Sequence, residues 1–114
     1  MSSDAVLTHC IGLNEEDLEI IERTGAKVSH DPVTDSLYSL GRAEVPKMRD
    51  RGIGVGLGND GSCFDGFRNI RHTSLVHKLV SGDLRELPPM DVLEMATIEG
   101  ASLFGKQNKI GSIE

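Results

Sequence analysis

The sequence predicts an α/β fold with a parallel sheet. Short apolar segments alternate with segments of helical periodicity, in the order strand, helix, strand, helix, strand, helix, helix, and the connections between them are short. Each of the three predicted strands ends in a histidine or an aspartate. The carboxyl ends of parallel strands meet at one edge of a sheet, where α/β proteins place their functional groups. Right-handed crossovers would put the helices outside a barrel or on both faces of an open sheet.

The first strand and the first helix follow from local signals. Residues 5–10 (AVLTHC) form an apolar run with no helical signal before it, which is typical of a buried strand. Asn14 is a good helix N-cap, and Asp17 three residues later completes a capping box. Gly25 is predicted to end this helix in the left-handed conformation. Its apolar side chains are Leu13, Leu18 and Ile21.

The middle of the chain is predicted to hold two more strands. Residues 26–30 (AKVSH) form the second strand, and a polar loop is expected over residues 33–40. Residues 42–51 follow as a helix that ends at Gly52, and residues 53–58 form the third strand. The side chains expected to point inward from that helix are Val45 and Met48.

The last part of the chain is predicted to be helical. A long helix covers residues 67–80, a second covers residues 90–96 after two prolines, and a third covers residues 97–104 before Gly105. The expected inward face of the long helix consists of Ile70, Leu75, Val76, Leu79 and Val80.

Composition limits the classes of function. The 114 residues suffice for one small domain, and its core must be aliphatic because aromatic residues make up only 4%. A net charge of −6 argues against a nucleic-acid binder that follows the phosphate backbone, but allows a small nucleobase as substrate. No apolar run approaches the ~18 residues of a membrane span, and the first residues lack the features of a signal peptide. Two cysteines without metal-ligand spacing favour a cytoplasmic location.

Three strand ends carry the candidate chemistry. They are His9, His30 and Asp60, a set that points to a metal or acid–base site. Each also has a structural interpretation: His9 as a buried hydrogen-bonded histidine, His30 as a loop cap, and Asp60 as a turn residue. Two further histidines, His72 and His77, lie five residues apart on a predicted helix and are interpreted as surface or core residues.

The stretch GVGLGNDGS contains a formal match to the dinucleotide-binding pattern G-x-G-x-x-G at residues 56–61. A true fingerprint opens a helix at its glycines and carries an acidic residue ~20 positions on, at the end of the next strand. Here the helix begins several residues after Gly61, and only helices follow. The glycines at positions 54, 56 and 58 are therefore interpreted as packing residues that share one face of a strand.

Three longer segments carry a family resemblance. LTHCIGLNEEDLEIIERTGAKVSHDP, VPKMRDRGIGVGLGNDG and VLEMATIEGASLFG with IGSIE together resemble the metal-dependent amidohydrolase superfamily, in the branch of cytosine and guanine deaminases, S-adenosylhomocysteine deaminases and chlorohydrolases. The resemblance implies a (β/α)8 TIM barrel, of which residues 1–114 match strands six to eight with their helices. Residues 110–114 resemble the passage back into the family's small β-sandwich domain.

The resemblance implies roles for five residues. Asp60 matches the aspartate at the end of strand eight, which binds the metal and takes a proton from the attacking water. His9 matches the strand-six histidine that polarises this water. His30, Thr34 and Asp35 match the HxPxSN segment that lines the substrate pocket, with threonine in place of serine and aspartate in place of asparagine.

The implied enzyme is a hydrolase that uses zinc or iron to deaminate, or dechlorinate, a small nucleobase-like heterocycle. The family's H-x-H pair, its strand-five histidine and its proton-shuttle glutamate are not in these 114 residues. We therefore expect this chain to be the C-terminal part of such an enzyme and to be inactive alone. It should bind no metal of its own, or offer only Asp60 as a ligand. We also expect it to self-associate through open sheet edges or apolar faces. The alternatives are a non-catalytic folded module with idle site residues and, less favoured, a nucleotide-binding domain.

Overall fold

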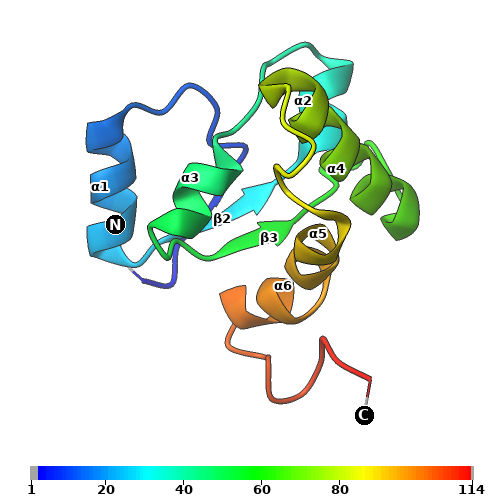
Figure 1. Cartoon of the computed structure of the whole chain (residues 1–114). Helices are drawn as coiled ribbons and strands as arrows, with labels where there is room; N and C mark the ends of the chain where they lie inside the picture. The colour runs from blue at the N-terminus through cyan, green and yellow to red at the C-terminus, as the bar shows by residue number, and fades with distance from the viewer. Residues whose placement is uncertain (1–2, 114) are drawn as a thin grey trace.

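The computed structural model describes residues 3–113, which form a three-stranded parallel sheet and the helices around it (Figure 1). The strands pair in the order β1-β2-β3, with Val6 opposite Lys27 and Val28 opposite Val55. The predicted α/β fold with parallel strands is confirmed. In chain order the elements are β1 (Val6–Thr8), α1 (Glu15–Thr24), β2 (Lys27–His30), α2 (Pro32–Leu37), α3 (Val45–Asp50), β3 (Val55–Leu57), α4 (Gly66–Ser81), α5 (Pro89–Ala96) and α6 (Ile98–Leu103).

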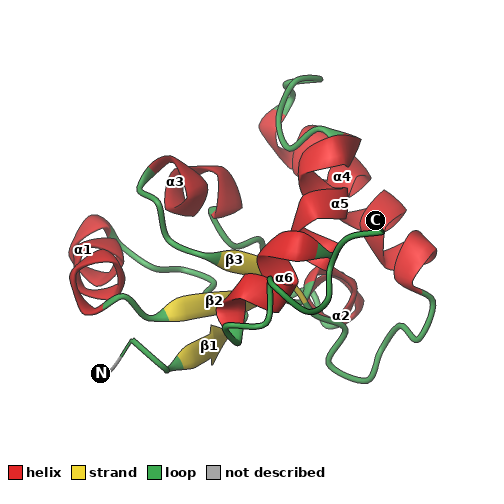
Figure 2. Cartoon of the chain, turned by 90° about the horizontal axis from the view of Figure 1, so that it is seen from below, coloured by secondary structure: helices red, strands yellow, loops and turns green. Residues whose placement is uncertain are grey.

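Different helices cover the two faces of the sheet. Helix α6 packs against one face of β3. Gly54 and Gly56 lie on this face, and a β-carbon at either position would contact Leu103 of α6. In Figure 1 α6 lies below β3, and in Figure 2, seen from below, it lies in front of the strands. The packing interpretation of these glycines is confirmed. The other face is buried in an aliphatic core that includes Leu18, Ile21, Val28, Val45, Met48, Val55, Val92 and Met95.

Helix α1 forms where its local signals predict it. The Asn14 side chain accepts a hydrogen bond from the backbone N–H of Asp17, and the Asp17 side chain accepts one from the N–H of Asn14. Gly25 ends the helix with a φ of 70°. Leu18 and Ile21 are buried as expected. Because caps and apolar face agree, this helix is specified by a short segment of sequence.

Helix α2 occupies the segment for which a loop is predicted, so that prediction is wrong. Pro32 stands in the first turn, where its fixed φ favours a helix and its missing N–H costs nothing. The N–H of Asp35 bonds to the carbonyl of Asp31, and the N–H of Tyr38 to that of Thr34. Buried side-chain contacts of Thr34 and Asp35 compensate for the weak helix propensity of Ser, Thr and Asp.

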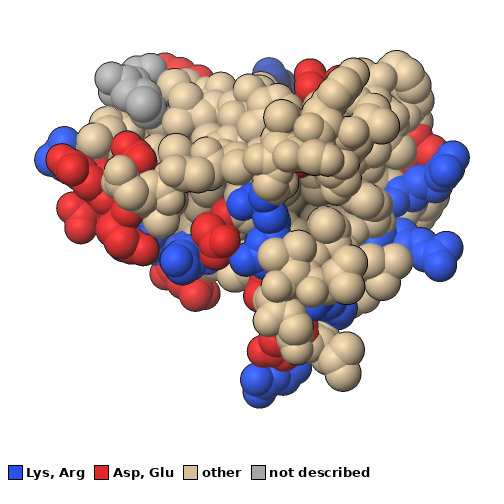
Figure 3. Space-filling view, turned by 90° about the horizontal axis from the view of Figure 1, so that it is seen from above, with Lys and Arg blue, Asp and Glu red and all other residues tan. Residues whose placement is uncertain are grey.

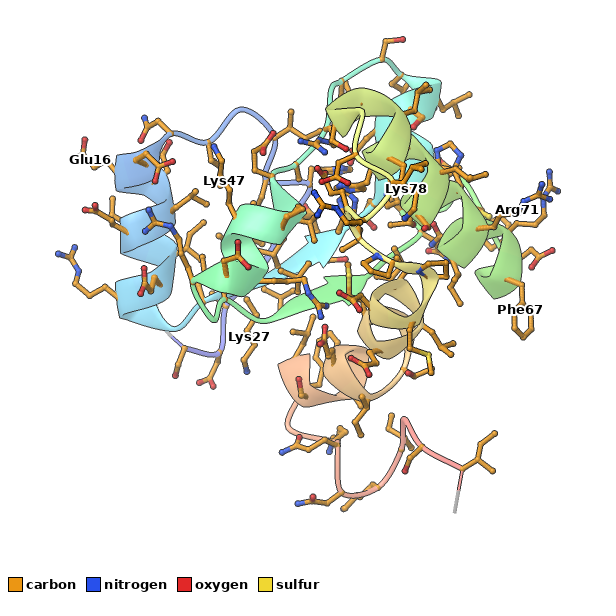
Figure 4. All side chains as sticks on the ribbon, viewed as in Figure 1. Glu16, Lys27, Lys47, Phe67, Arg71 and Lys78 are labelled. Atoms are coloured by element: carbon orange, nitrogen blue, oxygen red, sulfur yellow. The ribbon has the colours of Figure 1, made fainter. Side chains whose placement is uncertain are left out.

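Helix α4 turns a different face inward from the one that its apolar residues predict. Leu79 is 83% exposed, and Leu75 and Val80 are also exposed. Figure 4 shows Phe67 and Arg71 projecting away from the body of the protein. The helix lies over strand ends and loops, where polar side chains bond to free carbonyls: Asn69 Nδ2 donates to the Gly58 carbonyl at 2.7 Å. The buried residues are Asn69, Thr73, Ser74 and His77.

The surface carries its charge in separate groups. Figure 3 shows acidic side chains gathered at the left, over α1, whose first turn holds Glu15, Glu16 and Asp17. Lys and Arg form separate groups on this face rather than a continuous basic area, in keeping with a net charge of −6. Among residues 3–113, no helix is both long and apolar enough to cross a membrane.

Candidate functional site

The structure brings three of the five predicted site residues together at one edge of the sheet. His9 follows β1, Asp35 lies in α2 just after β2, and Asp60 follows β3. His9 Nδ1 lies 2.7 Å from Asp35 Oδ1, and His9 Nε2 lies 3.6 Å from Asp60 Oδ2. The imidazole of His9 thus stands between two carboxylates. We call His9, Asp35 and Asp60 the rim cluster.

Backbone geometry aims His9 and Asp60 toward each other. His9 and Cys10 have φ values of 65° and 54°, a left-handed conformation that is uncommon outside glycine. The His9 N–H still bonds to the Ser29 carbonyl, at 3.0 Å, so β1 stays attached to β2 while its chain turns away. Asp60 has a φ of 40° within a turn closed by the Ser62 N–H and the Asn59 carbonyl. Such conformations persist where the surroundings impose them, and they cluster at functional sites.

Electrostatics within the rim cluster favour a charged imidazole. The hydrogen bond to Asp35 raises the pKa of His9, and the charges of Asp35, Asp31 and Asp60 add to this effect against desolvation. Burial raises the pKa of Asp35, while the same hydrogen bond from His9 opposes the rise. His9 therefore donates its Nδ1 proton to Asp35 and presents Nε2 toward Asp60. The carboxylate of Asp60 is 52% exposed and accessible from the rim.

The other two predicted site residues lie below the rim. Thr34 is buried, and its hydroxyl donates to Ser62 Oγ at 2.7 Å, which ties α2 to the loop after β3. His30 is 1% exposed, and its Nε2 lies 3.0 Å from Nε2 of His77 on α4. The structure therefore places both side chains as neighbours of the rim cluster rather than within it.

A buried group that the sequence did not reveal extends this site toward α4. His77 is fully buried, and its Nδ1 lies 3.5 Å from Arg42 Nη1 and 3.4 Å from Glu86 Oε1. Arg42 also forms an ion pair with Glu86. One signal in the sequence does exist: Asn69, Thr73 and His77 recur at four-residue spacing, which places polar side chains on one helical face.

The described residues do not make a complete metal site. Within residues 3–113, no three His, Cys, Asp or Glu side chains form a group that could hold a metal ion. A catalytic zinc takes about three protein ligands and a water. The rim cluster offers one exposed carboxylate, Asp60, and this donor set alone does not fit such an ion.

Comparisons with known proteins agree on one family. The sequence profile of the amidohydrolase family matches residues 1–114. A 5'-deoxyadenosine deaminase of Methanosarcina mazei is 36% identical over 108 residues, which cover 91% of this chain and 25% of that protein. A 5-methylthioadenosine/S-adenosylhomocysteine deaminase of Syntrophomonas wolfei is 37% identical over 110 residues, covering 93% and 26%. The chain thus spans about a quarter of the length of these relatives.

Solved structures of similar proteins give the same picture. A zinc-bound adenosine deaminase from Xanthomonas campestris superimposes with a TM-score of 0.90 and 25% identity, over 99% of this chain and 27% of that one. A guanine deaminase from C. acetobutylicum, with guanine in its active site, gives a TM-score of 0.79 and 29% identity, over 96% and 27%. The three strands and their helices therefore have the arrangement of one part of a larger fold.

Proposed function

This chain belongs to the amidohydrolase family, and we propose that it forms the C-terminal part of a (β/α)8 barrel, with β1, β2 and β3 as strands six, seven and eight. The match over the whole chain to about a quarter of each relative supports this assignment. So does the parallel order of three strands whose carboxyl ends carry the rim cluster. We further propose that residues 110–114 begin the return to a small β-sandwich domain; residue 114 lies outside the described residues.

For the whole protein we propose hydrolytic deamination of a nucleobase-like heterocycle. The single observation that carries this proposal is His9 held between Asp35 and Asp60 at the carboxyl ends of the strands. His9 Nε2 is free to donate a hydrogen bond at the rim, and the exposed carboxylate of Asp60 is placed to accept a proton from water. The named relatives deaminate adenosine derivatives, which supports a small purine-like substrate.

We also propose the surroundings of this chemistry. Asp60 is one ligand of a divalent ion, zinc or iron, whose remaining ligands are outside this chain; the zinc of the Xanthomonas campestris structure supports a divalent ion. The segment from His30 to Asp35, with Thr34 between them, borders the substrate pocket. Cys10 and Cys63 are free thiols, which supports the cytoplasmic location that we propose.

A chimera tests the proposed function. We expect that this chain, replacing the last quarter of the Methanosarcina mazei 5'-deoxyadenosine deaminase, yields an enzyme that releases ammonia from 5'-deoxyadenosine. Asp60→Asn in the chimera should lower kcat/KM by about a thousandfold or more, because the exposed proton acceptor and metal ligand is lost. The matched control is Asp50→Asn at the end of α3, an exposed carboxylate far from the strand ends, which should keep full activity.

The same assay with the unfused 114-residue chain and added zinc should give no ammonia, because the rim cluster alone does not complete a metal site. A folded, zinc-loaded chimera that is inactive, or one in which Asp60→Asn changes nothing, would favour a non-catalytic module with idle site residues. The observation that favours this second candidate function is that the described residues do not supply a complete set of metal ligands.

We propose that the isolated chain self-associates. β1 and β3 are both edge strands, and large apolar side chains such as Phe67, Leu79 and Leu84 are more than four-fifths exposed. Light scattering should show dimers at millimolar chain concentration that dissociate on dilution to micromolar. Val6→Lys, which adds a charge to the β1 edge, should favour the monomer, whereas Ser36→Lys, at an exposed position of α2, should not. A monomer at every concentration would contradict this proposal.

A further inference from the structure

We propose that Arg42 and His77 are positioning residues that fix which ring nitrogen of His30 carries its proton, and through His30 hold Asp35 in place under His9. This inference rests on the proposed function for its catalytic meaning. The contacts that carry it are present in the isolated chain. Its residues come from the loop before α3, from α4, from the end of β2 and from α2.

A line of neighbouring polar side chains leads from Arg42 to the rim cluster, with hydrogen bonds at every step except that between His30 and Asp35. Arg42 Nη1 lies 3.5 Å from His77 Nδ1, and His77 Nε2 lies 3.0 Å from His30 Nε2. His30 Nδ1 then faces Asp35 Oδ2 at 3.9 Å, and Asp35 Oδ1 bonds to His9 Nδ1 at 2.7 Å. His30, His77 and Asp35 are at most 2% exposed.

The contact between the two Nε2 atoms determines the protonation of both rings. One nitrogen must donate and the other must accept, so one ring carries its proton on Nε2 and the other on Nδ1. A second proton on either ring would place a charge in the core, at a cost in desolvation. Burial lowers the pKa of His30 to about 3, with the neighbouring His77 and Arg42 adding to this effect, and burial also lowers the pKa of His77. Both rings are therefore neutral near pH 7.

Arg42 decides between the two possible arrangements. A guanidinium only donates, so beside Arg42 the Nδ1 atom of His77 accepts, and its Nε2–H donates to His30. His30 then carries its proton on Nδ1, directed at Asp35. In the opposite arrangement His77 would donate to Glu86, whose Oε1 already accepts from Arg42, and a lone pair of His30 would face the carboxylate of Asp35. Glu44, bonded to Arg42 Nη2 at 3.0 Å, helps to anchor this arginine.

Two buried atoms at the end of this line support the chosen arrangement. Among the described residues, His30 Nδ1 and Asp35 Oδ2 have no hydrogen-bond partner, although they face each other. An N–H on His30 turns this pair into an attractive contact that a small ring rotation closes, whereas a lone pair makes it repulsive. An ionised Asp35 held in this way accepts the Nδ1 proton of His9. Arg42 thus acts on the rim through two histidines.

Nitrogen NMR of the 114-residue chain tests this inference directly. Long-range ¹⁵N–¹H correlation spectra distinguish ring protons on Nδ1 from those on Nε2. We expect His77 with its proton on Nε2 and His30 with its proton on Nδ1 at pH 7. Arg42→Met, which keeps the apolar stem and removes the donor, should invert both, because His77 then donates to Glu86. Arg42→Lys should restore the original arrangement, and Arg71→Met on the outer face of α4 should change nothing.

The reverse assignment in the unmodified chain would overturn the inference, as would unchanged tautomers in Arg42→Met. If Arg42→Met fails to fold, the assignment in the unmodified chain decides alone. In the chimera, Arg42→Met should lower kcat about tenfold with little change in KM, as is usual for partners that orient a reacting group. An inactive chimera with the expected tautomers would refute the proposed function and leave the positioning network standing.

Discussion

Replacing Gly56 with alanine is expected to lower the free energy of unfolding by about 1–3 kcal/mol, the usual cost of adding atoms to a filled core. A β-carbon at position 56 would lie 2.6 Å from Leu103 Cδ1 and 3.2 Å from the Cα atom of Gly100. Leu103 is buried and its side chain would have to rotate, while the Gly100 contact is with backbone, which does not rotate away. Helix α6 would have to shift away from β3.

Urea denaturation measures this cost, and the chain offers a matched control. Gly66 begins α4, and a β-carbon there meets nothing within 4 Å. Gly66→Ala should therefore be neutral or should raise stability, by up to about 1 kcal/mol, because alanine is the better helix former. Leu103→Ala should lower the free energy of unfolding less in the Gly56→Ala variant than in the unmodified chain, because the new methyl group and the leucine side chain would occupy the same space. Equal stability of Gly56→Ala and Gly66→Ala would contradict the close approach of α6.

The sequence predicts those parts of the fold whose signals are local. Asn14, Asp17 and Gly25 specify α1 within a dozen residues, and the apolar runs locate the strands. Helix α4 shows the limit of such signals. Its apolar stripe predicts an inward face, but tertiary context reverses the choice because the carbonyl of Gly58 and the ring of His30 require polar partners. Helix α2 is missed for the same reason, since Thr34 and Asp35 are stabilised by distant contacts.

The same limit applies to the candidate site, of which the sequence predicts some residues and misses others. His9 and Asp60 are found because the end of a parallel strand is a position that the sequence reveals. Arg42 and His77 are not found, because the contact between His30 and His77 joins residues 47 positions apart and no period in the sequence links them. The strand-end rule locates groups at the surface of a site. The groups that orient them lie deeper, where the packing of α4 against α2 and the end of β2 brings them together.

Stability should fall as the pH is lowered from 6.5 to 5, by about 2 kcal/mol from His30 alone. Burial holds the pKa of His30 at about 3 in the folded chain, against 6.5 in the unfolded chain. Between these values the unfolded state binds a proton that the folded state refuses, so each pH unit costs about 1.4 kcal/mol. His77, whose pKa burial also lowers, acts in the same direction. The contribution of these two neutral histidines to the free energy of unfolding is fully present above pH 6.5 and is lost as the pH falls.

Other titratable groups near His30 and His77 change the stability in the opposite direction or in a different pH range. The raised pKa of His9 gives a contribution that is complete below pH 6.5 and is lost as the pH rises through its folded pKa. The raised pKa values of Asp31 and Asp35, caused first by burial, let the folded state take up protons earlier than the unfolded state. Their effect opposes that of the histidines as the pH approaches the range of carboxylates. The slope just below pH 6.5 therefore reports His30 and His77 most directly.

Urea unfolding at pH 7, 6.5, 6, 5.5 and 5 measures how the free energy of unfolding changes with pH. A double variant, His30→Asn with His77→Gln, keeps hydrogen-bonding side chains that do not titrate and should abolish most of this change. His72→Gln removes a partly buried histidine of the same helix that lies outside this pair, and it should preserve the dependence of stability on pH. In the unmodified chain, NMR should show the ring of His30 still neutral at pH 5, a result that does not depend on whether the double variant folds. Protonation of His30 near pH 6 would mean that the core under the rim is open to water, because desolvation by burial is the largest cause of its lowered pKa.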